Sequence, residues 1–131
     1  MNTITVYRIE NPTTHHGMWY DANGKYDPVI QELCPNGITK DLPMPFNKAQ
    51  QTDGYKWYSA GKSIENMHQW FSAEDAQRLV NNGFKLFQFK VNMYQQLDME
   101  VLFCREGVVD CKEIPLDFIW PEVNELIAVI G

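Results

Sequence analysis

Clusters of basic residues are missing from this chain of 131 residues, in which 11 Lys and Arg stand against 17 Asp and Glu. Nucleic-acid affinity comes largely from clustered cations, so we do not expect direct nucleic-acid binding. The acidic residues give a formal net charge of −6 and are spread along the chain. They indicate either a solvated surface or an acidic face that docks on a basic protein surface.

Cysteine is scarce, and a leader or membrane segment is not evident. Cys34, Cys104 and Cys111 are odd in number and irregularly spaced, so they do not form a disulfide framework. Met1 is followed directly by the strand-like TITVYRI, with no apolar signal region. No apolar stretch approaches the roughly 20 residues that a membrane span needs. We therefore expect a reducing location, the cytoplasm, and no contact with a membrane.

Motifs for metal and phosphate binding are also lacking. His15 and His16 are adjacent, and no Cys, His or carboxylate recurs around them at metal-ligand spacing, so we expect an exposed loop pair and no metal. The segment SAGKS, residues 59–63, is not a P-loop, because Lys56 stands where the first glycine is required. We interpret it as a helix cap; an anion at the helix N-terminus is the alternative.

Two other residues are candidates for catalytic groups. His68 follows Glu65 at the i, i+3 spacing of a helix, which favours a surface or boundary histidine over a general base. Cys34 stands beside Pro35 in a loop and would need a lowered pKa to act as a nucleophile. Neither residue specifies a reaction.

Alternation and capping signals predict the secondary structure. Residues 4–9 alternate as a first strand, and residues 87–93 and 99–104 read as later strands, the last continuing after a turn at 106–107. Ser63 and Ser72 are N-cap residues of two consecutive helices, and Gly83 ends the second. Pro121 begins a closing helix. The order predicts a single α+β domain, residues 1–131, with a mainly antiparallel sheet covered by the helix pair.

A long loop-rich excursion follows the first strand, over residues 11–54. It repeatedly combines Pro, Gly, Asn and Asp, which are turn formers, and only residues 28–34 could hold a short helix. Such a segment cannot be a free linker, because it also carries large apolar side chains. We expect its aromatic residues to hold it against the body of the protein.

Arg8 is the most informative single residue. It lies on the same face of the first strand as Ile4 and Val6. An arginine on a core-side face needs a carboxylate or a bound anion to offset its desolvation. Arg8 therefore either pairs with an internal acid or reaches an anionic ligand at the edge of the sheet. Glu100, on a later strand, is the natural acid for both interpretations.

The segments VYRIEN, GMWY, KWYSAGKSIENMHQWFS, GFKLFQFKV and MEVLF together resemble small accessory proteins of tailed bacteriophages of enteric bacteria. The resemblance extends from Tyr7 to about Trp120. It implies an accessory phage product, a class that often inhibits host proteins, including CRISPR and other defence systems.

The layout of the chain is also similar to that of ADP-ribosyltransferases, whose pattern is Arg, then Ser-Thr-Ser, then a Glu-rich or Gln-x-Glu turn. The resemblance implies NAD as cofactor, with Arg8 as phosphate clamp, Ser59 as ribose contact and Glu100 as catalytic acid. The chain departs from the pattern, with YSAGKS in place of Ser-Thr-Ser and no Q-x-E or E-x-E in MEVLFCREG. These departures put the activity in doubt.

Two hypotheses result. The first is a non-enzymatic phage protein that needs no cofactor and inhibits a host protein, a defence component, in the host cytoplasm. Rigid aromatic residues dominate interface energetics, so the contacts would come from Trp19, Tyr20, Tyr26, Trp57 and Tyr58. The second is an ADP-ribosyltransferase-like enzyme, or a degenerate nucleotide binder, that uses Arg8 and Glu100. The sequence leaves the oligomeric state open.

Overall fold

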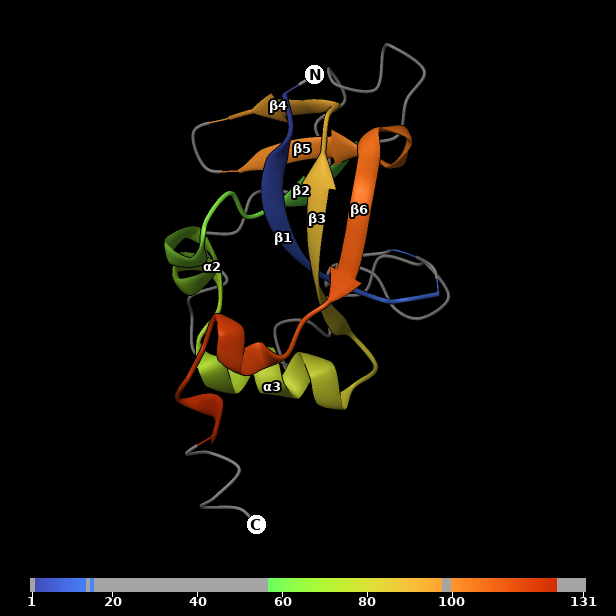
Figure 1. The fold of residues 1–131 in the computed structure, drawn as a ribbon. Helices are drawn as coiled ribbons and strands as arrows, with labels where there is room; N and C mark the ends of the chain where they lie inside the picture. The colour runs from blue at the N-terminus through green and yellow to red at the C-terminus, as the bar shows by residue number, and fades with distance from the viewer. Residues whose placement is uncertain (1, 14, 16–56, 98–99, 125–131) are drawn as a thin grey trace.

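A computed structural model describes residues 2–13, 15, 57–97 and 100–124 of the protein (Figure 1). The predicted α+β class with antiparallel pairing is confirmed. In chain order the elements are β1 (Ile4–Glu10), β2 (Trp57–Ala60), α2 (Ile64–Trp70), α3 (Ala73–Asn81), β3 (Lys85–Val91), β4 (Tyr94–Gln96), β5 (Val101–Cys104), the 3₁₀ helix η3 (Arg105–Gly107), β6 (Val108–Glu113) and the 3₁₀ helix η4 (Leu116–Phe118).

Both α-helices begin after the predicted cap residues, and the second ends just before the predicted glycine. The hydroxyl oxygen of Ser63 accepts a hydrogen bond from the backbone N–H of Asn66 at 3.0 Å. The hydroxyl oxygen of Ser72 accepts one from the backbone N–H of Asp75 at 3.1 Å. Each cap satisfies a donor that the first turn of a helix leaves unpaired. Gly83, with φ of 96°, follows α3 in the left-handed conformation that only glycine adopts without strain.

The strands form two three-stranded antiparallel sheets, in the orders β1-β3-β6 and β2-β5-β4. The short strands β2 and β4, and therefore the second sheet, were not predicted from the sequence. In Figure 1 the second sheet crosses behind the upper half of the first, α2 lies to the left of β1, and α3 lies below the first sheet. A reciprocal pair of backbone hydrogen bonds, at 2.9 and 2.8 Å, joins Tyr7 of β1 to Gly61 just after β2.

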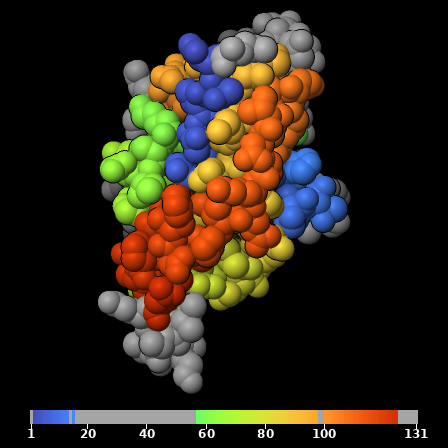
Figure 2. Space-filling view, viewed as in Figure 1, coloured from blue at the N-terminus to red at the C-terminus, as the bar shows by residue number. Residues whose placement is uncertain are grey.

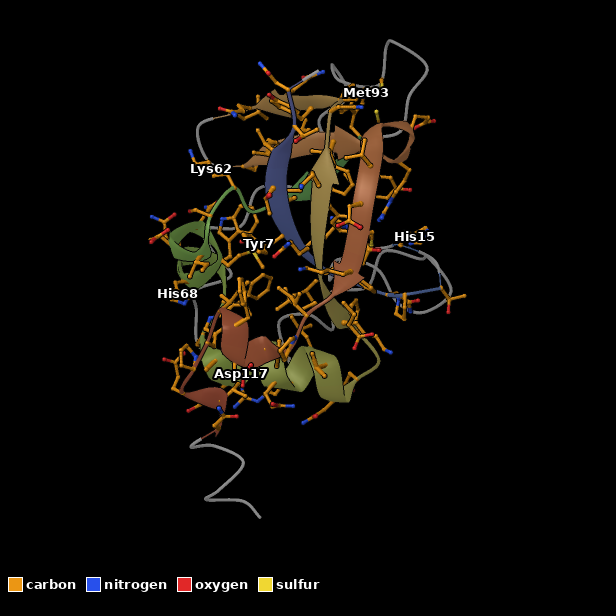
Figure 3. All side chains as sticks on the ribbon, in the orientation of Figure 1. Tyr7, His15, Lys62, His68, Met93 and Asp117 are labelled. Atoms are coloured by element: carbon orange, nitrogen blue, oxygen red, sulfur yellow. The ribbon has the colours of Figure 1, made fainter. Side chains whose placement is uncertain are left out.

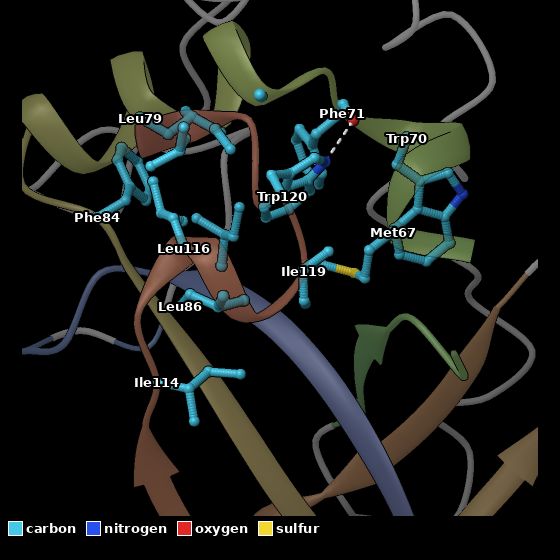
Figure 4. Close-up of a cluster of buried hydrophobic side chains, with 14 residues drawn as sticks. Met67, Trp70, Phe71, Leu79, Phe84, Leu86, Ile114, Leu116, Ile119 and Trp120 are labelled. Carbon is cyan, nitrogen blue, oxygen red and sulfur yellow. Dashed lines mark hydrogen bonds between the residues drawn. The ribbon is translucent and has the colours of Figure 1, made fainter. Parts of the chain in front are cut away.

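Each face of the first sheet covers its own apolar cluster. The alternation of β1 sends Ile9 into the cluster beneath the helices and Val6 into the cluster between the two sheets. The close-up in Figure 4 shows the helix-side cluster, which gathers Met67, Trp70, Phe71, Leu79, Phe84, Leu86, Ile114, Leu116, Ile119 and Trp120. The cluster between the sheets contains Val6, Ala60, Phe89, Val91, Val101 and Phe103. Both faces of β1 and β3 are therefore buried.

Some predictions fall partly or wholly outside the described residues. The excursion over residues 11–54 is described only at 11–13 and 15, so its short helix at 28–34 is not tested. Of the closing helix from Pro121, residues 121–124 form a turn and the start of a helix, and the rest lies outside the described range. None of the described helices is long and apolar enough to cross a membrane.

Candidate functional site

Glu10, only 2% exposed, is the centre of a buried ion cluster at the end of β1. Its Oε1 atom accepts a hydrogen bond from Arg8 Nε at 2.8 Å and another from Arg105 Nη2. Its Oε2 atom lies 3.1 Å from His15 Nδ1. Arg8 and Glu10 are two residues apart on one strand, so they lie on the same face, the one toward the second sheet. Of the two interpretations of Arg8, the structure shows the pairing with an internal acid, but the acid in direct contact is Glu10 and not the expected Glu100.

All three nitrogen atoms of the Arg8 guanidinium donate to acceptors within the protein. Besides the Nε bond to Glu10, Nη1 donates to the carbonyl of Ser59 at 2.7 Å and Nη2 to the carbonyl of His15 at 3.0 Å. Burial lowers the pKa of Arg8 from its usual value, and the negative charge of Glu10 opposes that shift. Three of the five N–H groups of this guanidinium are thus bonded within the protein.

The ring of Tyr58 lies beside both arginines. The guanidinium carbon of Arg105 is 4.5 Å from the centre of the Tyr58 ring, and that of Arg8 is 5.1 Å away. Arg105 also lies 4.9 Å from the ring of Phe89 and 5.3 Å from that of Phe103. Guanidinium groups bind favourably to aromatic faces at such distances. The ring of Tyr58, one of the residues predicted to contact a host protein, thus already packs against the two arginines of the cluster.

The structure brings Arg8, Ser59 and Glu100 together. Glu100 is 8% exposed and hydrogen bonds with the side chain of Ser59. Burial raises the pKa of Glu100, while the Ser59 hydrogen bond and the charge of Arg8 oppose the rise. Its Oε2 atom has no hydrogen-bond partner among the described residues. Glu100 is thus a buried carboxyl with one unpaired oxygen, and it lies near an arginine whose three nitrogen atoms all donate to other acceptors.

Other predicted site residues lie elsewhere or outside the described range. Trp57 is half-buried in β2, while Trp19, Tyr20, Tyr26, His16 and Cys34 are outside the described residues. His68 is exposed in the last turn of α2, where its Nε2 contacts the carbonyl of Ile119, as a boundary histidine does. Figure 3 shows His15 and His68 on opposite sides of the molecule, so they share no site. The described residues contain no group of three His, Cys, Asp or Glu that could hold a metal.

A surface hollow of about 190 Å³ lies away from the ion cluster. It opens between the end of α3 and the segment before η4, and none of the ion-cluster residues lines it. The residues that line it are Val80, Gly83, Phe84, Lys85, Leu86, Glu113, Ile114, Pro115 and Leu116. This hollow therefore gives a ligand no access to Arg8 or Glu100.

Sequence reasoning did not single out Glu10 or Arg105. The signal for Glu10 was present, because RIE places an acid two residues after Arg8 on one strand face. Arg105 had no comparable signal, since it stands in the turn after β5 and reaches Glu10 only through the packing of the two sheets.

Comparison with protein families gives one informative result. Residues 1–117 match the model of the family described as Bacteriophage T4 Y00F protein. Neither the curated proteins nor the solved structures that were searched include a match to the chain.

Proposed function

The chain belongs to the Bacteriophage T4 Y00F protein family, and from this premise we propose that it is an accessory protein that binds and inhibits a host protein. The proposed place of action is the cytoplasm of the infected bacterium, and the proposed target is a component of a host defence system, as for anti-CRISPR proteins. The protein acts by occupying a surface of its target and has no reaction of its own.

The observation that carries this proposal is the closed ion cluster. Every nitrogen of the Arg8 guanidinium already donates to a protein acceptor, and Glu10 is enclosed by Arg8, Arg105 and His15. A nucleotide-handling enzyme needs such an arginine to be available for phosphate. Here the cluster joins β1 to the second sheet, which is a structural task and favours a binding protein.

The contact surface that we propose combines acidic charge with aromatic side chains. The net charge of −6 favours a target with a basic surface, because complementary charge speeds association and selects the partner. Trp19, Tyr20, Tyr26 and Trp57 are the proposed anchors. Tyr58 is less suited, since its ring already contacts the two arginines.

Affinity capture from host lysate tests this proposal. The tagged protein should retain a defined bacterial protein, and Trp19→Ala and Tyr26→Ala should each reduce its recovery about tenfold or more, as expected for aromatic hot spots. Phe118→Ala is the matched control, because Phe118 is an aromatic residue, 48% exposed, outside the proposed surface. If the folded Trp19 and Tyr26 variants capture every partner of the parent protein, the proposed surface is wrong.

The convergence of Arg8, Ser59 and Glu100 favours a second candidate, a nucleotide binder. Titration with NAD, followed through the indole N–H signals of the four tryptophans by NMR, separates the two functions. Saturable shifts that disappear in a folded Arg8→Lys variant would support nucleotide binding. An unchanged spectrum at about 1 mM NAD, where even weak ligands bind, would reject it.

A further inference from the structure

β6 forms an edge of the first sheet. It pairs with β3 on one side, and no strand among the described residues pairs with it on the other. Residues 109–113 are all exposed, and Figure 2 shows β6 (orange) on the surface of the molecule. The edge of a strand presents alternate N–H and C=O groups that can pair with another strand.

The charges on this edge are of opposite sign and two residues apart. Asp110 and Lys112 therefore lie on the same face of β6. Within the described part of the chain, neither side chain forms an ion pair. Edges that avoid pairing often carry lysine or charges that repel an incoming strand. The pattern Asp-Cys-Lys is different, because in an antiparallel pair of two such strands each Asp can face the Lys of the other strand.

We propose that β6 is a self-association edge, which pairs antiparallel with β6 of a second copy of this chain about a two-fold axis at Cys111. In this register Asp110 lies opposite Lys112 of the other copy, and Lys112 lies opposite Asp110. Opposite charges that face each other across antiparallel strands stabilise the pair, and two-fold symmetry forms the contact twice. The pairing extends the β1-β3-β6 sheet into the same sheet of the second copy.

Charge complementarity between the two β6 strands favours this register, and it favours a second copy of the chain as the partner. An axis at Asp110 or at Lys112 would instead put that residue opposite its own copy, which is a repulsive pair. With the axis at Cys111, Glu113 lies opposite Val109 and keeps its own partner, Lys85, at 3.3 Å. The side chain of Val109, the more exposed of the two large hydrophobic residues found at the described surface, is then covered. Pairing with a second copy therefore gives Asp110 and Lys112 opposite charges to face and also covers Val109.

The proposal is tested by exchanging the charges at residues 110 and 112 and measuring dimer formation by sedimentation velocity. The parent protein should show a monomer–dimer equilibrium between about 10 μM and about 1 mM, the range of weak interfaces. Asp110→Lys and Lys112→Asp should each weaken the dimer about tenfold, because two attractive pairs become repulsive. The double variant, Asp110→Lys with Lys112→Asp, should restore the parent dissociation constant to within about threefold. Glu122→Lys, an exposed change of equal charge away from β6, should have no effect.

Cysteine cross-linking supplies a second measurement in a Cys34→Ser background. Cys104 is fully buried, whereas Cys111 is exposed and lies at the proposed axis. A short bismaleimide should therefore link two chains through Cys111, and Cys111→Ser should abolish the linked dimer. A monomer throughout the concentration range overturns the proposal. So does a dimer that is insensitive to the charge exchange, because it would use another surface. The proposal does not depend on the proposed function.

Discussion

Arg8 and Arg105 donate hydrogen bonds to the same atom, Oε1 of Glu10, although Arg8 lies on β1 and Arg105 in η3, the connection from β5 to β6. Arg8 and Glu10 lie on β1 of the first sheet, and Arg105 directly follows β5 of the second. One buried carboxylate thus holds β1 against the connection between the two sheets through charge-assisted hydrogen bonds, which are stronger than neutral ones. The consequences of this connection can be measured as stability.

Replacement of Arg8 by alanine should destabilise the protein by about 3 kcal/mol, because it removes one partner from a buried carboxylate and leaves the Ser59 carbonyl without its donor. Urea unfolding followed by circular dichroism measures the change. Lys85→Ala is the control, since it breaks an exposed ion pair with Glu113 and should cost less than about 1 kcal/mol. Equal losses in the two variants would show that the Glu10 cluster has no special structural role.

Local signals were sufficient to predict much of the fold, because they depend on neighbouring residues only. Ser63 and Ser72 cap helices by bonding the N–H three residues later, and Gly83 stops a helix through its own backbone. The second sheet was missed because β2 has four residues and β4 has three, too few for alternation to be distinctive. Such short strands are specified by the partner that they meet.

In the ion cluster, too, one feature could be predicted from the sequence and another depends on the tertiary structure. That Arg8 needs an internal acid follows from desolvation, which any arginine on a core face must offset. The identity of that acid depends on geometry: Glu10 contacts Arg8 directly, whereas Glu100 acts on it at longer range and bonds with Ser59. Sequence separation alone cannot rank two such acids.

Two buried tryptophans should respond differently to replacement by phenylalanine. Trp120 Nε1 donates to the carbonyl of Phe71 at 3.0 Å, as the dashed line in Figure 4 shows. Trp70 Nε1 is buried with no hydrogen-bond partner among the described residues. Trp120→Phe should therefore cost about 1 kcal/mol more than Trp70→Phe, because only the former leaves a buried carbonyl without its donor. Chemical denaturation of both variants checks this difference, and the reverse order would contradict it.

Glu100→Gln should alter the pH dependence of stability. Burial raises the pKa of Glu100 in the folded protein above its ordinary value of 4.5. Between these two pKa values the folded state binds more protons than the unfolded state, so the free energy of unfolding falls as pH rises. Glutamine cannot ionise and escapes this loss. The advantage of the variant over the parent should thus grow as pH rises above 4.5 and then level off; an advantage that does not change with pH would refute this.

Two glycines should resist replacement for different reasons. Gly83→Ala should cost about 1 kcal/mol, because the site has φ of 96° and no atom within 4 Å of an added Cβ. Gly107→Ala should cost more, about 3 kcal/mol, since its Cβ would lie 2.5 Å from Met93 Cβ and 2.6 Å from Met93 N. Asparagine tolerates the left-handed conformation, so Gly83→Asn should be milder than Gly83→Ala. Thermal unfolding ranks all three variants.

The reciprocal hydrogen bonds between Tyr7 and Gly61 hold together the two points of the chain between which the long intervening segment begins and ends. The bond from Arg8 to the Ser59 carbonyl reinforces the same junction, so residues 7–8 and 59–61 lie at one place although they are far apart in the sequence. The entropy of closing a loop rises only slowly with its length. We therefore expect changes of length confined to residues 16–56, outside the ion cluster, to cost the two sheets little stability.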